Sequence, residues 1–582
     1  MINAELSRVF ERIADLLEID GADRFRVNSY RRAARTFKDT TEDIATLAAQ
    51  NRVESLPGVG KGTAARIRQY IKTGRIDVLA ELEAKLPSGL PALLDIQGMG
   101  PKKIASLHKK LGIASLDDLK EAIAAGKVAQ LAGFGATSVK RIEEGIAFLE
   151  RSQGRTPLGV ALPIAEELAG RVGALKGVRR VEIAGSLRRG EETVGDIDIL
   201  CQAEEGKDDL CPSVIEAFVG FEDVKRVLAS GATKGSVTVG LEGGDEVQVD
   251  LRVVPAESFG AALQYFTGSK DHNVRLREIA VRKKLRLNEY GLYDGKTQIA
   301  GKVEKDVYRK LGVVWVPPEL RQDRGEFDPG FDAEDLVTVG DIRGDLHLHT
   351  VASDGRNTIE EMAQAAKVRG YEYIAICDHS KSSTIANGLS IERMERHIEA
   401  VRAADKKIKG IKILVGTECD ILPDGSLDYP DALLARCDLV VAAIHVAMGK
   451  GGSGKLSPTQ RTLAAIANPH VTVIAHPTGR LIGQREAMEI DMSAVVGAAA
   501  DNGTMMEVNA DWRRLDLKTE HIREALDAGV TLVINTDAHW TGGLEQMRFG
   551  VMTARRGVAR RSSVLNTYTL PALRKRIAAK RA

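Results

Sequence analysis

The stretch AGSLRRGEETVGDIDILC, residues 184–201, decides how the middle of this chain folds. Asp196 and Asp198 flank one apolar residue in a run that predicts a β-strand, so both carboxylates should project from the same face. Asp250, in EVQVDLRVV, lies in a second predicted strand that could pair beside it. An isolated Asp-x-Asp is usually a surface feature, but three carboxylates at one point suit Mg²⁺ and leave positions open for phosphate oxygens. The stretch therefore predicts a two-metal site for phosphoryl transfer.

On either side of this stretch the sequence pattern changes. Residues 1–150 carry apolar positions at helical spacing, broken by Gly-containing turns, and predict an all-α region. β-rich runs mixed with helical stretches from residue 158 predict an α+β unit, and the proline-containing, charged segment 315–330 predicts a linker. After residue 341, strand-like runs alternate with helices and predict βα repeats around a parallel barrel or sheet. The predicted domains are 1–85 and 86–155, both helical, 156–255 and 256–318, a linker at 319–340, and 341–575.

The composition excludes several classes of protein. With 582 residues, 43% of them hydrophobic and 28% charged, the chain is expected to fold into several domains and is neither disordered nor collagen-like. Its 82 basic and 81 acidic residues exclude a uniformly basic coat, so any nucleic-acid site must be local. Five scattered cysteines without a CxxC pair predict reduced thiols in a cytoplasmic protein. We expect neither a signal peptide nor a membrane span.

Two Gly-x-Gly turns, each followed by a predicted helix, recur in the amino-terminal region. They are LPGVGKGTAARI at 56–67 and IQGMGPKKIASL at 96–107, and LAGFGATSVKRI at 131–142 is a weaker third copy. One such turn is as often a plain helix C-cap, but glycines also let backbone N–H groups approach a phosphate. The repeated turns resemble helix-hairpin-helix motifs, which grip DNA backbones without reading sequence. The expected DNA contacts are Gly58, Gly60, Lys61, Gly98, Gly100 and Lys102.

The carboxyl-terminal region gathers metal-ligand residues at the ends of its predicted strands. His347 and His349 alternate in DLHLHTVASDG and so should point the same way. Six of the chain's 11 histidines stand at such strand ends, which in a βα barrel is the functional face. A single histidine there would more often be a satisfied core or surface group, but random scatter rarely concentrates six. The candidate ligands are His347, His349, Asp354, His379, Glu418, His445, His476, Asp537 and His539.

The middle region resembles the family X DNA polymerases. GSLRRGEETVGDIDIL is similar to that family's nucleotidyltransferase signature without gaps, and YFTGS at 265–269 is similar to its thumb motif. The resemblance implies that Asp196, Asp198 and Asp250 bind catalytic Mg²⁺ or Mn²⁺. It further implies that Ser186, Arg189 and the Gly195 backbone hold the triphosphate, with Gly268 also at the nucleotide. Tyr265 and Phe266 would lie by the sugar, Asn273 by the base, and Arg277 by the template strand.

RVNSYRRAA, residues 26–34, resembles the amino-terminal domain of the same family. That resemblance implies that Arg26 and Tyr30, with Lys61 nearby, hold the 5′-phosphate across a gap. Relatives with lyase activity use a lysine in the helix after the first hairpin, where this chain has Arg66, and a guanidinium is not a Schiff-base nucleophile. Unless Lys61 or Lys72 substitutes, we expect no lyase chemistry by that route.

The carboxyl-terminal spacing resembles the PHP (polymerase and histidinol phosphatase) domain, a distorted (βα)7 barrel with a trinuclear metal site. The resemblance implies one metal at His347, His349, Glu418 and Asp537, with Glu418 bridging to a second at His445 and His476. Asp354, His379 and His539 would hold the third. Mixed imidazole and carboxylate ligands suit Mn²⁺, Zn²⁺ or Fe²⁺ better than Mg²⁺ alone. Some PHP domains on polymerases have lost ligands, but all nine positions are filled here, which favours hydrolysis.

Together the resemblances imply a bacterial family X DNA polymerase with a PHP domain, expected to be a monomer. Its substrates would be gapped or primer-template DNA and deoxynucleoside triphosphates, and its role short-gap filling in base excision repair with 3′-5′ exonuclease or 3′-end-processing activity. The alternatives are a polymerase whose PHP domain is only structural and a phosphatase fused to a template-independent nucleotidyltransferase. A DNA-end-binding scaffold with both sites silent would require lost ligands, and none is missing.

Overall fold

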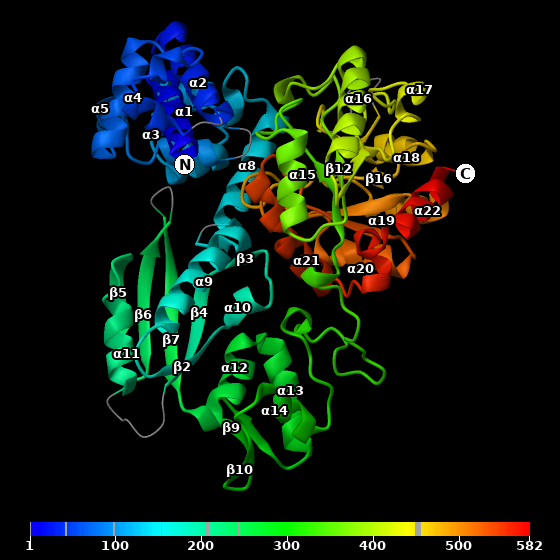
Figure 1. The fold of residues 1–582 in the computed structure, drawn as a ribbon. Coiled ribbons are helices and arrows are strands. Elements are labelled where there is room, and N and C mark those ends of the chain that lie inside the picture. Colours follow the sequence, from blue (N-terminus) through cyan, green and yellow to red (C-terminus); the bar gives the residue numbers. More distant parts are fainter. Residues whose placement is uncertain are drawn as a thin grey trace. The chain divides into compact units, whose positions relative to one another are not determined.

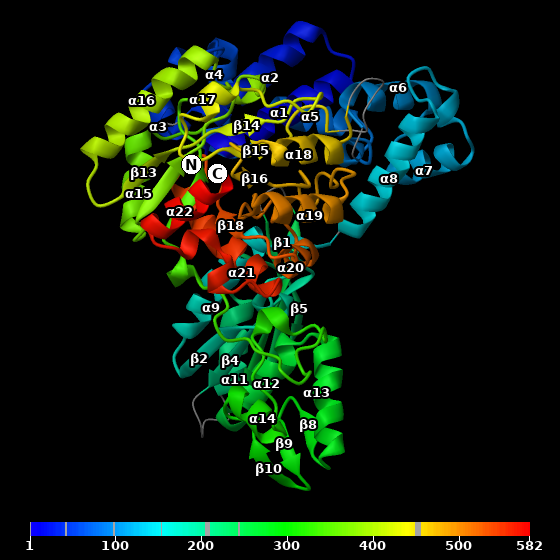
Figure 2. The same cartoon turned by 90° about the vertical axis from the view of Figure 1, so that its right-hand side faces the viewer.

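A computed structural model describes residues 2–40, 43–96, 99–152, 154–203, 210–241, 245–448 and 456–581. It divides into two compact units, one of residues 1–153 with 483–485 and one of residues 154–482 with 486–582 (Figures 1 and 2). In the part of the chain described, no helix combines the length and apolarity that crossing a bilayer requires.

The first unit is built from helices, as predicted. One continuous apolar core, which includes Leu6, Phe10 and Phe37, joins residues from Leu6 to Ile146. Helix ends follow local sequence, since the Asp23 side chain caps the second helix and Gly74 ends the fourth in the left-handed region. The helices are α1 (Asn3–Ile19), α2 (Arg24–Asp39), α3 (Ile44–Ala49), α4 (Lys61–Thr73), α5 (Asp77–Lys85), α6 (Pro101–Leu111), α7 (Leu116–Ala124) and α8 (Ala136–Ser152).

The second unit begins with a five-stranded mixed sheet in the order β2-β4-β7-β6-β5, drawn in cyan to green in Figure 1. Alternating residues such as Ile197, Ile199 and Val249 pack in one core with α9 and α11, so the intervening polar residues lie on the opposite face. The strands are β2 (Val178–Ile183), β4 (Asp196–Ala203), β5 (Val224–Ser230), β6 (Lys234–Gly240) and β7 (Glu246–Val254). Around them lie β1 (Thr156–Pro157), α9 (Leu158–Gly173), α10 (Gly185–Arg188), β3 (Thr193–Val194) and α11 (Leu210–Val219).

A smaller α+β subdomain follows the sheet. It comprises α12 (Phe259–Thr267), α13 (Lys270–Arg282), β8 (Arg286–Asn288), β9 (Gly291–Asp294), β10 (Thr297–Ala300) and α14 (Glu304–Leu311). Part of the segment predicted as a linker belongs to its interior. Arg321 is fully buried and its Nη1 donates to Glu304 Oε1 at 2.7 Å, while Glu326 lies 2.9 Å from His272 Nδ1. The linker prediction missed this because proline and charge are also compatible with a buried ion pair.

The remainder of the second unit is the predicted βα barrel. Its parallel strands form two sheets, β11-β12-β13 and β14-β15-β16-β17-β18, in which β13 and β14 are separated by two residues. The His349 N–H donates to the Ala538 carbonyl at 3.0 Å, and this contact links β11 to the end of β18. The strands are β11 (Gly344–Leu348), β12 (Tyr373–Ile376), β13 (Lys412–Val415), β14 (Glu418–Asp420), β15 (Val441–Ala443), β16 (Val473–Ile474), β17 (Met505–Asn509) and β18 (Leu532–Asn535).

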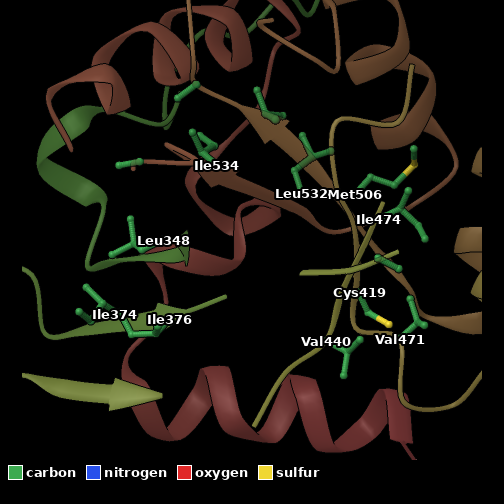
Figure 3. Packing of buried hydrophobic residues seen from close by; sticks show 14 of the residues in the cluster. Leu348, Ile374, Ile376, Cys419, Val440, Val471, Ile474, Met506, Leu532 and Ile534 are labelled. Carbon is green, nitrogen blue, oxygen red and sulfur yellow. The ribbon is translucent and has the colours of Figure 1, made fainter. Parts of the chain in front are cut away.

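The barrel strands are apolar on both faces because helices cover their outer side. Leu348, Ile376 and Ile534 are among the buried side chains that Figure 3 shows between strands and helices. This arrangement confirms the predicted fold class of helical region, α+β domains and distorted (βα)7 barrel. The barrel helices are α15 (Ile359–Val368), α16 (Ile391–Lys407), α17 (Asp431–Leu434), α18 (Pro458–Ala467), α19 (Met492–Asn502), α20 (Thr519–Asp527), α21 (Met547–Arg556) and α22 (Leu570–Arg581).

Candidate active sites

The three aspartates of the middle region lie on two adjacent strands. β4 and β7 run parallel, and their register pairs Asp198 directly with Asp250, as the predicted pairing of the two strands requires. Asp196 lies two residues before Asp198 and so on the same face of β4. The fold thus brings the three carboxylates to one patch at the start of β4.

The three carboxylates are close enough to influence one another's pKa, but their oxygens do not converge on a single point. Burial, followed by the charges of Asp196 and Asp250, raises the pKa of Asp198 to about 7. Although burial opposes it, bonds from Lys234 and Gln248 lower the pKa of Asp250, whose Oδ2 lies 2.7 Å from Lys234 Nζ. Among the described residues, the three carboxylates do not form a set with all ligand atoms within 4.8 Å of one another. A divalent cation bound between these carboxylates would offset their mutual repulsion and favour their closer approach.

Gly185 makes room for this patch at the turn after β2. Its φ of +64° lies in the left-handed region, and a Cβ there would stand 2.4 Å from Asp198 Oδ2. No larger residue fits without moving the carboxylate. The sequence signal was the Gly-Ser turn that precedes the aspartates.

The predicted triphosphate residues surround the same turn. Ser186 is half-buried in α10, and Gly195 is exposed beside Asp196. Arg189 Nη1 donates to the Thr267 carbonyl at 2.6 Å, and its Nε is buried without a hydrogen-bond partner. The neighbouring Arg188 is bound through both terminal nitrogens to Glu304, at 2.8 and 3.0 Å. Arg188 therefore joins this turn of the five-stranded sheet domain (the palm, β2 to β7) to the following α+β subdomain (the thumb, α12 to α14).

The predicted sugar and base contacts lie on α12 and α13. The Tyr265 and Phe266 rings meet edge to face with centroids 5.2 Å apart. Asn273 Nδ2 donates to the Tyr265 carbonyl at 2.7 Å, so it holds the end of α12 in this structure. Gly268, with φ +66°, follows α12, and Arg277 is half-buried on α13. Asn273 and Tyr265 are therefore brought together by the hydrogen bond between them.

The predicted phosphate-binding residues of the amino-terminal unit lie on α2, in the turn before α4 and at the first residue of α4. Gly58 has φ +76°, Gly60 caps α4 and Lys61 is its first residue. The Arg66 guanidinium lies 5.5 Å from the centre of the Tyr30 ring, while burial raises the pKa of Tyr30 and the charges of Arg66 and Arg26 oppose that rise. Arg66, which stands where relatives with lyase activity have a lysine, therefore lies against the Tyr30 ring.

The second hairpin is described only in part. Gly100 caps α6, and Lys102 is exposed in its first turn. Gly98 lies outside the described residues.

The nine predicted ligands of the barrel converge at the carboxyl ends of its strands. Three sets have all their ligand atoms within 4.8 Å of one another. The sets are His347, His349, Glu418 and Asp537, then His379, Glu418 and His445, and then His349, Asp354, His379 and His539. His476 Nε2 is bonded to Glu418 Oε1 at 2.9 Å, so Glu418 lies between groups as predicted. The difference from prediction is that His349 and His379 each belong to two sets.

The donor set fits a cluster of divalent cations. Among the described residues, several buried ligand atoms make no hydrogen bond, including His347 Nε2, both ring nitrogens of His349, Glu418 Oε2 and Asp537 Oδ1. Unsatisfied buried polar atoms are costly, so such a group needs a partner that the protein alone does not provide. Burial, and then the neighbouring His539 and His379, lower the pKa of His349 to about 4, which keeps its imidazole neutral and able to coordinate.

A second layer of carboxylates orients these ligands, and sequence reasoning missed most of it. Glu507 Oε1 accepts a bond from His347 Nδ1 at 2.8 Å, which leaves Nε2 facing the cluster. Asp420 Oδ1 is bonded to His445 Nδ1 at 2.6 Å. Such carboxylate-histidine pairs are typical of metal sites. Asp420 follows Glu418 by two residues on β14, and this alternation was the available signal. Arg514 Nε lies 3.8 Å from Asp537 Oδ2, at the same mouth.

These geometries define a class of protein, a nucleotidyltransferase joined to a metal-dependent phosphoesterase. Comparison with known families gives four matches along the chain. Residues 1–76 match a helix-hairpin-helix domain, residues 90–146 a SAM-like helix-hairpin-helix tandem, residues 262–322 the DNA polymerase beta thumb, and residues 345–510 the PHP domain.

Curated relatives extend these matches to the whole chain. A Bacillus subtilis protein named "DNA polymerase/3'-5' exonuclease PolX" is 39% identical over 575 residues, which is 98% of each chain. A protein of Acetivibrio thermocellus named "Probable phosphatase" is 31% identical over 202 residues, 34% of this chain and 78% of that one. This chain belongs to the family X DNA polymerases that carry a carboxyl-terminal PHP domain.

Proposed function

We propose that the enzyme fills short gaps in DNA under the direction of a template and trims or unblocks 3′ ends with its PHP domain. The observation that carries the polymerase assignment is the register that sets Asp198 beside Asp250, with Asp196 on the same face. Those three aspartates would hold two Mg²⁺ or Mn²⁺ ions. When bound, the ions lower the pKa of a primer 3′-hydroxyl and stabilise the charge of the leaving pyrophosphate.

The protein's own residues would then position the substrates. Ser186, Arg189 and the Gly195 backbone would hold the triphosphate, and Gly185 would let their turn lie directly against Asp198. Tyr265 and Phe266 would flank the sugar, while Asn273 would turn from the Tyr265 carbonyl to the base. Lys61 begins a helix, where both its charge and the free backbone N–H groups favour a 5′-phosphate.

In the PHP domain we propose a cluster of up to three Mn²⁺, Zn²⁺ or Fe²⁺ ions held by the nine ligands. Bound ions would supply a nucleophilic hydroxide and neutralise charge on a scissile phosphate. Glu507 and Asp420 fix the tautomers of His347 and His445 so that Nε2 of each ring faces the cluster. The uncompensated buried ligand atoms support hydrolysis over a purely structural barrel. Because the relatives named as phosphatases match this region, removal of a 3′-phosphate is a second candidate reaction.

We further propose that the enzyme acts as a monomer in the cytoplasm, in base excision repair. In the part of the chain that the structure describes, the five cysteines form no disulfide bond and four of them are buried, which suits a reducing compartment.

A gapped duplex tests the polymerase proposal. Each of the four deoxynucleotides would be supplied singly to a primer facing a one-nucleotide gap. We expect insertion only of the nucleotide complementary to the template, and faster insertion when the downstream strand carries a 5′-phosphate. Lys61→Ala should remove the 5′-phosphate advantage, whereas Lys85→Ala, at an exposed lysine paired with Asp20, should not. Insertion without regard to the template would favour a template-independent transferase instead.

A further inference from the structure

The turn that carries the proposed triphosphate residues is held by the PHP domain. Arg556, at the end of α21, donates from Nη1 to the Arg189 carbonyl and from Nη2 to Glu191 Oε2, both at 2.8 Å. Gly190 lies between these two contacts with φ +66°, and a Cβ there would stand 3.2 Å from the end of Met552. The side chain of Arg556 is buried, with 7% exposed. Residues 189–191 are therefore pressed against α21 and bound to it.

A second arginine holds the next residue of the same turn. Arg480 donates to both carboxylate oxygens of Glu192, at 2.9 and 2.5 Å, and also to the Leu515 carbonyl. Its side chain is only 14% exposed. Arg480 lies four residues after His476, in the loop that leaves the metal cluster. Bidentate arginine-carboxylate pairs fix geometry as well as charge.

Apolar packing makes this boundary continuous. Leu515 and Phe549 of the barrel belong to the same buried cluster as Ile197 and Val249 of the palm sheet. The Trp512 ring lies so close to Gly159 of α9 that a Cβ there would approach it to 2.0 Å. The two arginines are thus the polar part of an interface that includes the palm core.

Arg189 is held at two points by two different parts of the chain. Arg556 binds its main-chain carbonyl, and the Thr267 carbonyl accepts from its side chain. A guanidinium that must meet a triphosphate works best when its backbone is already fixed, because ordering it on binding would cost affinity.

We propose that Arg556 and Arg480 are positioning residues of the polymerase reaction, which hold the 189–192 turn ready for the triphosphate. This inference rests on the proposed nucleotide role of Arg189. Through these two arginines the barrel would support nucleotide binding in the palm independently of its own metal ligands. Losing either arginine raises the KM for deoxynucleotide more than it lowers kcat, because the chemistry at the aspartates is unchanged.

Steady-state insertion of one nucleotide by the full chain tests this. Arg556→Gln and Arg480→Gln should each raise the KM for deoxynucleotide by about tenfold, since each removes charge-assisted hydrogen bonds. Removal of 3′ nucleotides should change by less than about twofold. Arg548→Gln is the matched control, because Arg548 pairs with Glu166 at the same boundary but away from the turn, and its KM should stay at the wild-type value. The double variant Arg480→Glu, Glu192→Arg should recover most of the lost affinity.

Arg189→Ala separates this inference from the proposal beneath it. If Arg189→Ala raises the KM but both arginine variants leave it unchanged, the positioning role is wrong. If Arg189→Ala itself leaves the KM unchanged, the nucleotide role of the turn is wrong. An equal fall in insertion and in 3′ removal, with a lower Tm and no recovery in the charge-swapped double variant, would mean that the arginines only stabilise the interface and would also overturn the inference.

Discussion

The palm site and the PHP site of this enzyme are built from different materials. The palm offers three carboxylates on one sheet face, and in the described part of the chain their oxygens do not all lie within 4.8 Å of one another, as the ligand atoms of each barrel set do. The barrel offers five histidines and three carboxylates in overlapping sets, most of them buried, and His476 is bonded to Glu418 of these sets. In the palm, Lys234 forms an ion pair with Asp250. In the barrel, Glu507 and Asp420 bind the ring nitrogens of His347 and His445 that face away from the cluster.

This difference predicts how tightly each site binds its metal ions. Mg²⁺ keeps several water or phosphate ligands. Because the palm has few carboxylates, we expect phosphate oxygens of the nucleotide to complete the coordination of its ions, and the ions to bind together with the nucleotide. Among its described residues, the barrel contains buried ligand atoms without hydrogen-bond partners, and we expect tightly bound ions to compensate them. We therefore expect metal to stay with the barrel during purification and to exchange freely at the palm.

Glu418→Gln should produce the largest effect. Glu418 belongs to two of the three ligand sets and bonds His476, so its loss weakens more than one ion. Removing a bridging charge should cut 3′-nucleotide removal by at least about a thousandfold, several kcal/mol in the barrier. Metal analysis of the purified protein should show fewer bound ions per chain, while primer extension stays at the wild-type rate. Full metal content in the variant would contradict the bridging role.

Glu304→Gln should lower stability by roughly 3 kcal/mol at neutral pH, because it leaves Arg188 and Arg321 without their buried counterion. Although burial opposes it, the charges of Arg321 and Arg188 lower the pKa of Glu304 from 4.5 to about 2. A lowered folded-state pKa adds stability above the unfolded value, and that stability is lost as pH falls. The difference in Tm between wild type and variant should therefore shrink as pH falls from about 4.5 toward 2. A difference that stays constant over that range would show that the ion pairs are not its source.

Gly185→Ala tests how closely the palm turn approaches its aspartates. The new Cβ would meet Asp198 Oδ2 at 2.4 Å, and a displaced carboxylate should slow primer extension by about a hundredfold. Gly170→Ala, on α9 where a Cβ meets nothing within 4 Å, is the matched control and should leave the rate unchanged. Nuclease activity should be normal in both variants. Normal extension by the Gly185 variant would mean that Asp198 tolerates displacement.

Asp420→Asn should have the smallest of these effects, because Asp420 acts through His445. The metal affinity of the barrel and its 3′-removal rate should fall by about 10- to 100-fold. Asp424→Asn, in the turn that follows β14, is the control, because the Asp424 carboxylate accepts hydrogen bonds from the backbone and side chain of Ser426. Titration of metal-stripped protein with Mn²⁺ would measure both. Equal behaviour of the two variants would remove Asp420 from the account of the metal site.

Most ligand positions could be predicted from the sequence, because alternation on a strand fixes which residues share a face. His347 with His349, and Asp196 with Asp198, are such pairs. Asp250 lies in a second strand-like run that was predicted to be able to pair beside the first, and the register of β4 and β7 sets it opposite Asp198. The local pattern alone shows which residues share a face of a strand, since the side-chain period of two does not depend on distant contacts.

Partners brought together across long separations could not be predicted. Lys234 reaches Asp250 from β6, Arg188 reaches Glu304 over 116 residues, and Arg556 reaches Arg189 over 367. Nothing in a local window marks Arg321 as buried, because its charge and the adjacent prolines are typical of an exposed linker. These pairings depend on the tertiary fold, and they are the contacts that couple the parts of the second unit.

One DNA substrate measures the central claim that two separate metal sites carry two activities. A primer labelled at its 5′ end, placed upstream of a one-nucleotide gap, lengthens when nucleotide is present and shortens when it is absent. Asp198→Asn should stop lengthening and leave shortening at the wild-type rate, and His349→Ala should do the reverse. If either substitution stopped both reactions, or if neither changed its own, the assignment of these two sites would be contradicted.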